Sequence, residues 1–204
     1  MNLLQSDFFT DQSFEKELME IKDPEFLKKE LLEKLKDGQK YAVMEEAVEF
    51  AEKAHKNQKR DEGTSYILHP LRVAIRLYHS GYRSPEILAA ALLHDVLEDS
   101  QTNPMTLKKK FGSRIGDAVL TLSKQTVNGK ISNPVYFQRL QSAGAEIQAI
   151  KIFDRIDNLY SLRLIDNHKK KEQYLQETQK YFLDLAKSSS VLKKNLDLAI
   201  SQIS

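Results

Sequence analysis

The sequence predicts an all-α fold, and three observations favour that class. Glycine and proline are scarce, with seven and five residues in a chain of 204. Apolar residues recur mostly at the spacing of one helix face. No segment shows a convincing alternation of apolar and polar residues, as a half-buried strand would. We therefore expect a single bundle of helices.

Composition narrows the class of protein further. The chain is 41% hydrophobic and 29% charged, which suits one globular domain with an adequate core. Its 31 basic and 29 acidic residues leave a net charge of +2, so we expect neither nucleic acid nor a membrane as a partner. No long apolar run or signal-like segment occurs, which predicts a soluble cytoplasmic protein. The absence of cysteine excludes disulfides, thiolate ligands and cysteine nucleophiles.

The first half of the chain carries clear helix boundaries. Asp23-Pro24-Glu25 is a helix start, with aspartate as the cap and proline in the first turn, and an apolar stripe follows until Gly38. A second helix over residues 43–54 ends in the polar run 57–63. After a loop, Pro70 opens a third helix. Ser84-Pro85-Glu86 repeats the start signature and should launch a helix that continues to Asp99.

The second half of the chain also carries signals of helix boundaries. A short helix ends at Gly112, a longer one covers residues 113–124, and another begins at Pro134 after a turn-like segment at 127–130. A strongly apolar helix should run from residue 146 to about residue 165, and two charged amphipathic helices fill the remainder. We interpret the basic run 168–171 as a helix edge or loop rather than a ligand site.

Four ionisable side chains crowd the end of the fourth helix. If that helix is continuous, His94, Glu98, Asp95 and Asp99 cover an arc of about 140° on one face. Carboxylates gathered there repel one another unless a cation or shared protons compensate. A solvated acidic face is the alternative, but residues 88–93 are too apolar for a surface helix. We therefore favour a bound divalent metal.

The apolar helix around Asp154 also has a narrow polar face. Asp154, Asn158, Lys151 and Arg155 share that face, opposite a continuous apolar one. Considered alone, such an Asp–Arg pair is more often a solvent-exposed pair without a functional role. His69 precedes a proline, which disfavours the helical conformation and should leave its ring free to turn inward at the mouth of a helix.

Taken together, two imidazoles and two carboxylates are a plausible ligand set for Mn²⁺, Fe²⁺ or Zn²⁺. These four side chains are those of His69, His94, Asp95 and Asp154. Their order resembles the H…HD…D signature of the HD-domain metal phosphohydrolases. More narrowly, residues 41–181 resemble the hydrolase domain of RelA/SpoT proteins and the stand-alone small alarmone hydrolases. The segments that carry this resemblance are Arg60 with Tyr66-Ile67-Leu68-His69-Pro70, residues 93–99 and residues 151–159.

The resemblance implies an all-α fold and a metal-dependent enzyme that removes the 3′-pyrophosphate from guanosine 3′,5′-bis(diphosphate) or a closely related nucleotide. It implies one divalent metal, expected to be Mn²⁺, held by His69, His94, Asp95 and Asp154. Glu98 and Asp99 match the catalytic pair of the family. Arg60 and Asn158 match its nucleotide contacts. The expected partner is a small nucleotide, and a homo-oligomer is left open.

The resemblance also implies a division of the chain. Residues 41–187 form the HD hydrolase domain, residues 1–40 an N-terminal helical extension, and residues 188–204 a C-terminal helix packing on the same domain. One departure concerns Asp61, which stands where the family carries a cation that stacks on the base. Two alternatives remain: another HD-type nucleotide phosphohydrolase, such as a nucleotidase, and a non-catalytic nucleotide-sensing module. Every position that matches a metal ligand or a catalytic residue of the family holds a side chain able to fill that role. This argues against a non-catalytic nucleotide-sensing module.

Overall fold

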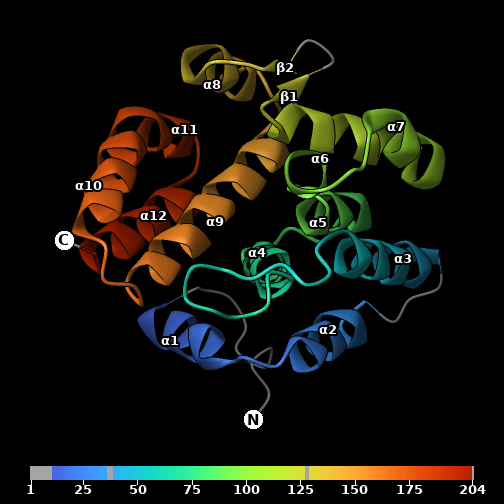
Figure 1. Ribbon diagram of the computed structural model, residues 1–204, viewed down its shortest axis with the longest axis horizontal. Helices are drawn as coiled ribbons and strands as arrows, with labels where there is room; N and C mark the ends of the chain where they lie inside the picture. The colour runs from blue at the N-terminus through green and yellow to red at the C-terminus, as the bar shows by residue number, and fades with distance from the viewer. Residues whose placement is uncertain (1–10, 36–38, 127–128, 204) are drawn as a thin grey trace.

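The computed structural model describes residues 11–35, 39–126 and 129–203, and nearly all of its regular structure is helical (Figure 1). The helices are α1 (Gln12–Glu20), α2 (Pro24–Glu33), α3 (Gln39–Ala54), α4 (Leu68–His79), α5 (Pro85–Leu92), α6 (Val96–Asp99), α7 (Pro104–Leu122), α8 (Asn133–Gln141), α9 (Ala145–Leu162), α10 (His168–Glu177), the π-helical turn η1 (Thr178–Phe182), α11 (Leu183–Ala186) and α12 (Ser190–Ser201). The predicted all-α class is confirmed. Within these ranges no helix combines the length and the apolar composition that crossing a bilayer requires.

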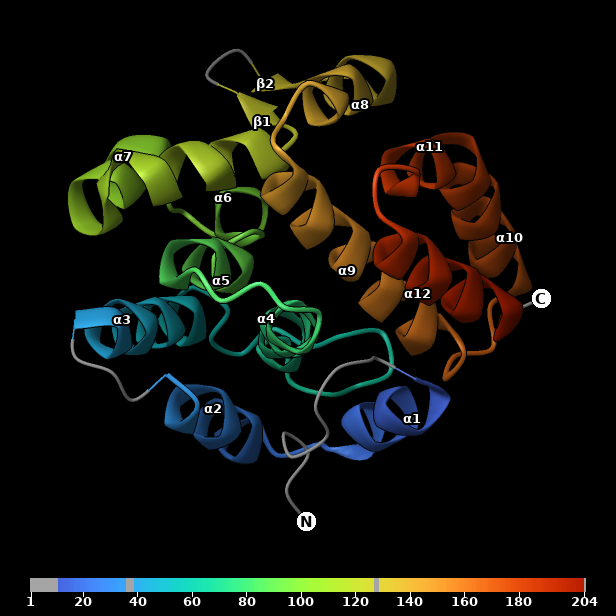
Figure 2. The same ribbon diagram turned by 180° about the vertical axis from the view of Figure 1, so that it is seen from behind.

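Two helices form the centre of the bundle. In both views α9 crosses the molecule, with α3, α5 and α7 on one side and α10 to α12 on the other (Figures 1 and 2). Helix α4 packs against α9, α5 and α2, and every one of its residues except Tyr78 is buried. Because α4 and α9 lie side by side in the core, polar side chains on their facing surfaces have little access to water.

The N-terminal segment contains two helices. The predicted start at Asp23 is confirmed, since its side chain accepts a hydrogen bond from Glu25 N at 3.0 Å. Helix α1 was not predicted from the sequence, although Asp11 caps it by accepting a hydrogen bond from Phe14 N at 2.8 Å. Gly38, the predicted end of the second of these helices, lies outside the described residues. Both helices lie beneath α4 (Figure 1).

The predicted continuous helix through Asp99 is wrong. Helix α5 ends at Leu92, a turn covers residues 93–95, and α6 begins at Val96. His94 Nδ1 lies 2.7 Å from the Ala91 carbonyl oxygen, which in a continuous helix would accept a hydrogen bond from Asp95 N. The side chain of His94 therefore competes with the backbone, and the four ionisable groups do not share one helix face.

His69 lies within α4 rather than before it. The helix begins at Leu68, two residues before the predicted start at Pro70. Proline is tolerated there because the N–H groups of the first helical turn have no partner within the helix. His69 is consequently held by regular backbone, with its ring in the core.

The remaining elements follow the prediction with small changes. The break at Gly112 is confirmed: it has φ 83° and ψ 166° and separates the two halves of α7, a conformation that favours glycine. The apolar helix ends at Leu162, slightly earlier than predicted. Two short strands, β1 (Gln125–Thr126) and β2 (Gly129–Lys130), pair at the predicted turn, whose centre lies outside the described residues. The basic run 168–171 forms the first turn of α10.

Candidate functional site

The four predicted metal ligands come from three places and lie together. His69 comes from the first turn of α4, His94 and Asp95 from the turn between α5 and α6, and Asp154 from α9. The Nε2 atoms of His69 and His94 lie 3.2 Å apart. Asp95 Oδ2 is 3.4 Å from His69 Nε2 and 3.2 Å from His94 Nε2. Asp154 Oδ1 is 3.3 Å and 3.7 Å from the same two nitrogens.

The far side of each imidazole is already engaged. His69 Nδ1 lies 2.7 Å from Asp157 Oδ2, and His94 Nδ1 lies 2.7 Å from the Ala91 carbonyl oxygen. Both partners are acceptors, so each Nδ1 carries a hydrogen. In the neutral ring the lone pair is then on Nε2, and both lone pairs face the two carboxylates. This arrangement needs positive charge at its centre, either a cation or a proton on each ring, and the donor set fits a divalent transition metal.

The surrounding carboxylates favour the protonated form of both imidazoles. Burial lowers the pKa of both imidazoles, but the neighbouring carboxylates outweigh it and raise the pKa of His69 to about 9 and that of His94 to about 10. Burial alone would raise the pKa of Asp95 and Asp154. His94 beside the first and Lys151 beside the second hold each pKa well below its usual range. Metal binding at this cluster would therefore release protons.

Tyr66 connects the cluster to Asp99. Its hydroxyl oxygen lies 2.7 Å from Asp95 Oδ2 and 2.7 Å from Asp99 Oδ2. Burial, followed by the charges of the two carboxylates, raises the pKa of Tyr66, so it stays protonated. The sequence places Tyr66 in the motif around His69 without assigning it a role, and nothing in its spacing signals this contact.

Glu98 and Asp99 point to different partners. Asp99 lies beside the cluster through Tyr66, whereas Glu98 Oε1 accepts a hydrogen bond from Lys124 N at 2.7 Å. Glu98 thus links α6 to the chain directly after α7. The two adjacent carboxylates are not equivalent. Asp99 contacts Tyr66, which also contacts the predicted ligand Asp95, whereas Glu98 contacts the backbone at Lys124.

A pocket of about 190 Å³ adjoins the cluster, because Tyr66 lines the pocket and its hydroxyl also contacts Asp95. Arg60 and Asn158 line this pocket from the loop before α4 and from α9. Arg60 Nη2 donates to Asn158 Oδ1 at 2.8 Å, and Asn158 Nδ2 donates to Asp154 Oδ1 at 2.6 Å. The predicted nucleotide contacts are therefore hydrogen-bonded to one another and to a predicted metal ligand.

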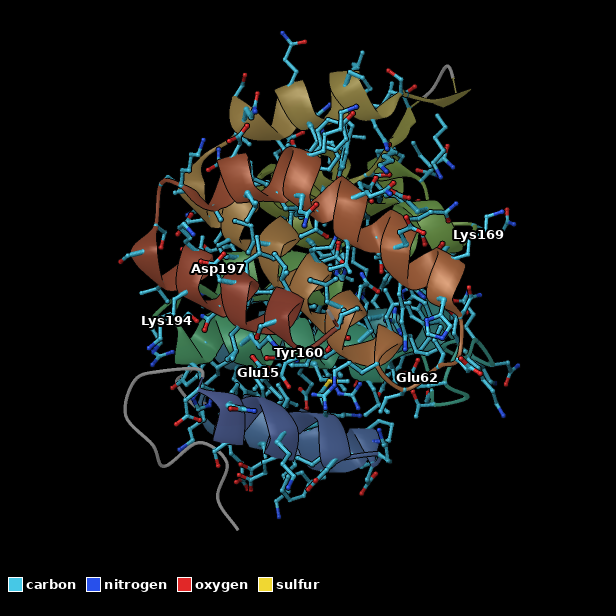
Figure 3. The ribbon with its side chains drawn as sticks, turned by 90° about the vertical axis from the view of Figure 1, so that its left-hand side faces the viewer. Glu15, Glu62, Tyr160, Lys169, Lys194 and Asp197 are labelled. Atoms are coloured by element: carbon cyan, nitrogen blue, oxygen red, sulfur yellow. The ribbon has the colours of Figure 1, made fainter. Side chains whose placement is uncertain are left out.

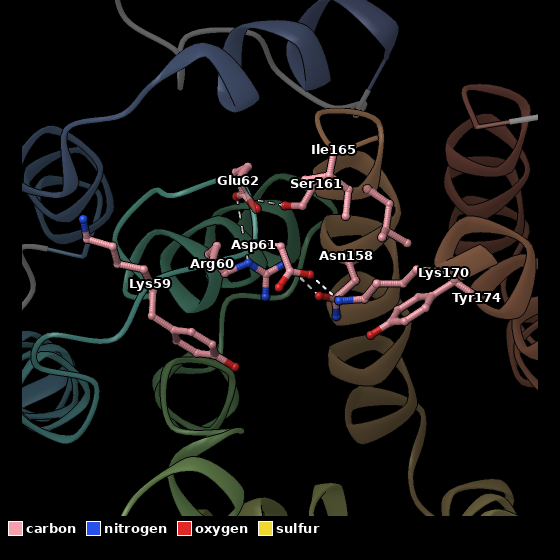
Figure 4. Close-up of a pocket in the computed structure, with 11 residues that line it drawn as sticks. Lys59, Arg60, Asp61, Glu62, Asn158, Ser161, Ile165, Lys170 and Tyr174 are labelled. Carbon is pink, nitrogen blue, oxygen red and sulfur yellow. Dashed lines mark hydrogen bonds and ion pairs between the residues drawn. The ribbon is translucent and has the colours of Figure 1, made fainter. Parts of the chain in front are cut away.

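The rim of the pocket holds an ion pair between Asp61 and Lys170 (Figure 4). Lys170 belongs to the basic run interpreted above as a helix edge. It does lie in the first turn of α10, and it also lines the pocket. A cation is thus present beside Asp61, although it comes from a distant part of the chain.

Asp157 is a buried charged residue of the site that was not predicted from the sequence. It lies three residues after Asp154, and its carboxylate contacts His69 and Arg76. Burial would raise its pKa, but Arg76 and His69 hold the pKa of Asp157 below its usual range. The available signal was the pair of arginines at positions 72 and 76 in the largely apolar helix α4, since buried guanidiniums require nearby acceptors.

Comparison with known proteins adds a family and several relatives. Residues 47–191 match the family model described as HD domain. The chain is 35% identical over 147 residues to a guanosine-3′,5′-bis(diphosphate) 3′-pyrophosphohydrolase of Aquifex aeolicus, covering 70% of this chain and 21% of that protein. A similar protein of Mycoplasma pneumoniae, named as a probable enzyme of this activity, is 31% identical, with coverage of 64% and 19%. The chain thus spans about a fifth of the length of these two relatives.

Shorter relatives match over most of their length. The guanosine-3′,5′-bis(diphosphate) 3′-pyrophosphohydrolase MESH1 of Danio rerio is 34% identical over 144 residues, covering 69% of this chain and 79% of that protein. A solved structure described as "A metazoan ortholog of SpoT hydrolyzes ppGpp and plays a role in starvation responses" aligns with a TM-score of 0.70 and 23% identity. It covers 79% of this chain and 95% of the other, which shows a shared fold.

Proposed function

The chain belongs to the HD domain family, and we propose that it is a metal-dependent hydrolase removing the 3′-pyrophosphate from guanosine 3′,5′-bis(diphosphate) or a closely related nucleotide. The observation that carries this proposal is the group of His69, His94 and Asp95, whose ligand atoms lie within 4.8 Å of one another beside a polar pocket. Asp154 Oδ1 lies 3.3 Å and 3.7 Å from the two imidazole Nε2 atoms of this group. The names of the relatives favour this activity over other phosphohydrolase reactions.

The residues present fit one divalent ion, for which we propose Mn²⁺. Two Nε2 lone pairs and two carboxylates supply the ligands, and Asp157 and Ala91 hold the imidazoles by their Nδ1 atoms. When bound, such an ion lowers the pKa of its water and polarises a phosphoryl oxygen. This chemistry suits hydrolysis of a pyrophosphate group.

The surrounding side chains have separate roles in this proposal. Arg60 offers charge-assisted hydrogen bonds to phosphate oxygens, and Asn158 holds its guanidinium in place. Asp99, beside the cluster, accepts a proton from the attacking water. Glu98, the other member of the proposed catalytic pair, shares in this proton transfer and also anchors the chain at Lys124.

The proposed function also implies a partner and a cellular location for the protein. A soluble nucleotide is the partner and the cytoplasm the expected location. The division into residues 1–40, 41–187 and 188–204 also remains a proposal. The packing of α12 against α9 supports the part of this proposal in which the C-terminal helix packs on the same domain.

One assay tests the proposed reaction. Purified protein with Mn²⁺ is incubated with guanosine 3′,5′-bis(diphosphate), its adenosine counterpart and nucleoside monophosphates, while released pyrophosphate and phosphate are measured separately. Pyrophosphate from the 3′-substituted nucleotides supports the proposal. Phosphate from monophosphates alone indicates a nucleotidase, and nucleotide binding without release of either indicates a sensor.

A further inference from the structure

We propose that the N-terminal helix α1 is a working part of the metal centre, because Glu15 acts through Arg76 and Asp157 to position His69. The inference rests on the proposed metal site and extends it to a helix outside the residues that match the family model, 47–191. Glu15 is a positioning residue in this account, since it touches none of the predicted metal ligands.

The contacts form an unbroken chain from α1 to the ligand. Arg76 Nε lies 3.1 Å and 3.0 Å from the two oxygens of Glu15, and Arg76 Nη2 lies 2.7 Å from Glu15 Oε2. Arg76 Nη1 donates to Asp157 Oδ1 at 2.6 Å. The other oxygen of Asp157 lies 2.7 Å from His69 Nδ1. Arg76 therefore contacts both Glu15 and Asp157, and Asp157 contacts both Arg76 and His69, each through different atoms of its side chain.

All four side chains are removed from water. The side chains of Arg76 and Asp157 are 0% exposed, that of His69 is 1% exposed and that of Glu15 is 3% exposed. Glu15 lies on the surface of α1 that faces the body of the molecule, close to the end of α9 at Tyr160 (Figure 3). A buried charge that loses its partner is strongly destabilised, so the members of this chain depend on one another.

Arg72 is a second buried arginine close to this series of contacts. It lies one turn before Arg76 in α4, is 0% exposed, and donates from Nη2 to the Ile21 carbonyl oxygen at 2.9 Å. Among the described residues, its Nε and Nη1 have no hydrogen-bond partner. Arg72 therefore adds a second buried positive charge, which interacts electrostatically with Asp157 and Glu62 without an ion pair to either.

Removing the charge of Glu15 should shift the ring of His69, because it changes the charges around Asp157. Arg76 would lose its charged acceptor at Nε and Nη2, and Asp157 would become the remaining carboxylate in contact with Arg76. Its Oδ2 would then be drawn toward Arg76 and away from His69 Nδ1. That hydrogen bond keeps the hydrogen on Nδ1 and the lone pair on Nε2, and loss of such an outer contact typically weakens metal binding about 10–100-fold.

The test measures Mn²⁺ affinity by titration calorimetry on the full, metal-stripped chain. We expect Glu15→Gln to bind Mn²⁺ about tenfold more weakly and Asp157→Asn about 10–100-fold more weakly. Glu20→Gln is the matched control, because Glu20 also belongs to α1 but its side chain is 67% exposed. A purely structural role for Glu15 would lower the melting temperature of the metal-free protein and leave the affinity of the folded protein unchanged.

Two further variants make each outcome decisive. If Glu15→Gln does not fold, Arg76→Lys keeps the charge but cannot serve both carboxylates, and it should show the same loss of affinity. Folded variants of Glu15 and Arg76 that bind Mn²⁺ as the wild type does would overturn the inference. If the wild type and Asp154→Ala bind Mn²⁺ equally poorly, the metal site itself is wrong. If only Asp154→Ala loses binding, the metal site stands and the role of α1 fails.

Discussion

Arg60 and Asn158 are 98 residues apart in the chain, and Arg60 Nη2 donates to Asn158 Oδ1 at 2.8 Å. Asn158 in turn donates to Asp154 Oδ1 at 2.6 Å. The groups proposed to hold the nucleotide are therefore joined to a group proposed to hold the metal. Variants at these positions can separate the two functions, since each side chain has its own expected loss.

Asp154→Ala should abolish tight metal binding while the protein stays helical. The change removes a carboxylate that lies beside both imidazoles, so affinity should fall by at least the roughly 10–100-fold typical of outer-shell losses. Elemental analysis after dialysis measures occupancy, and circular dichroism measures helicity. Asp166→Ala is the control because the Asp166 side chain is 97% exposed. Full occupancy in Asp154→Ala would exclude this residue as a ligand.

Glu98→Gln should retain the metal and lose most of its turnover. Glutamine can still accept the hydrogen bond from Lys124 N, so the change removes charge and preserves the backbone contact. We expect kcat to fall about 10²–10⁴-fold if the carboxylate takes part in proton transfer. Asp99→Asn, measured beside it, shows which carboxylate matters more. Wild-type turnover in Glu98→Gln would limit Glu98 to its structural contact.

Arg60→Lys should weaken substrate binding without releasing the metal. Lysine keeps the charge but lacks the planar fork that can hold Asn158 and a phosphate together. A lost charge-assisted hydrogen bond costs about 1.5–3 kcal/mol, which corresponds to a roughly 10–150-fold rise in KM. Steady-state kinetics measure this change, with Lys56→Ala at an exposed nearby position as the control. An unchanged KM would remove Arg60 from the substrate contacts.

Base preference should depend on the ion pair at the pocket rim. Asp61 neutralises Lys170, so the chain should discriminate guanine from adenine weakly. Asp61→Asn frees the ammonium group to stack on the base, and a cation–π contact of roughly 0.5–1 kcal/mol would change the kcat/KM ratio about two- to fivefold. The ratio is measured for guanosine and adenosine 3′-pyrophosphates. An identical ratio in Asp61→Asn and wild type would show that this pair does not set the preference.

Acid should loosen the packing of α1 through His79. This buried histidine packs on Phe14, with ring centroids 4.6 Å apart, and burial, followed by Arg83 and Lys34, lowers the pKa of His79 to about 4. The unfolded chain, with a pKa near 6.5, takes up the proton first as pH falls. Stability from neutral His79 is therefore complete above about pH 6.5 and is lost toward pH 4.

The measurement for His79 is urea unfolding at two pH values. Between pH 7 and pH 5 the free energy of unfolding should fall by roughly 1–2 kcal/mol more in the wild type than in His79→Gln. Both proteins keep every other titrating group, so the difference isolates this histidine. Equal losses in the two proteins would contradict the assignment.

The sequence by itself determined the helical class and most helix starts, because capping residues and apolar spacing act over only a few positions. The cap at Asp23, the proline starts of α5 and α8 and the break at Gly112 are all local features of this kind. It also named four candidate ligands, His69, His94, Asp95 and Asp154, through their resemblance to a known signature.

Only the tertiary structure decided how these side chains meet. An apolar run reads as one helix whether or not it breaks, so the turn at His94 could not be seen in the spacing of residues 88–99. The contacts of Tyr66 with two carboxylates, and of Glu15 with Arg76 across 61 positions, arise from the packing of separate helices. Local spacing places a side chain on one face of one helix, whereas the partner of a buried charge depends on which other helix lies against that face.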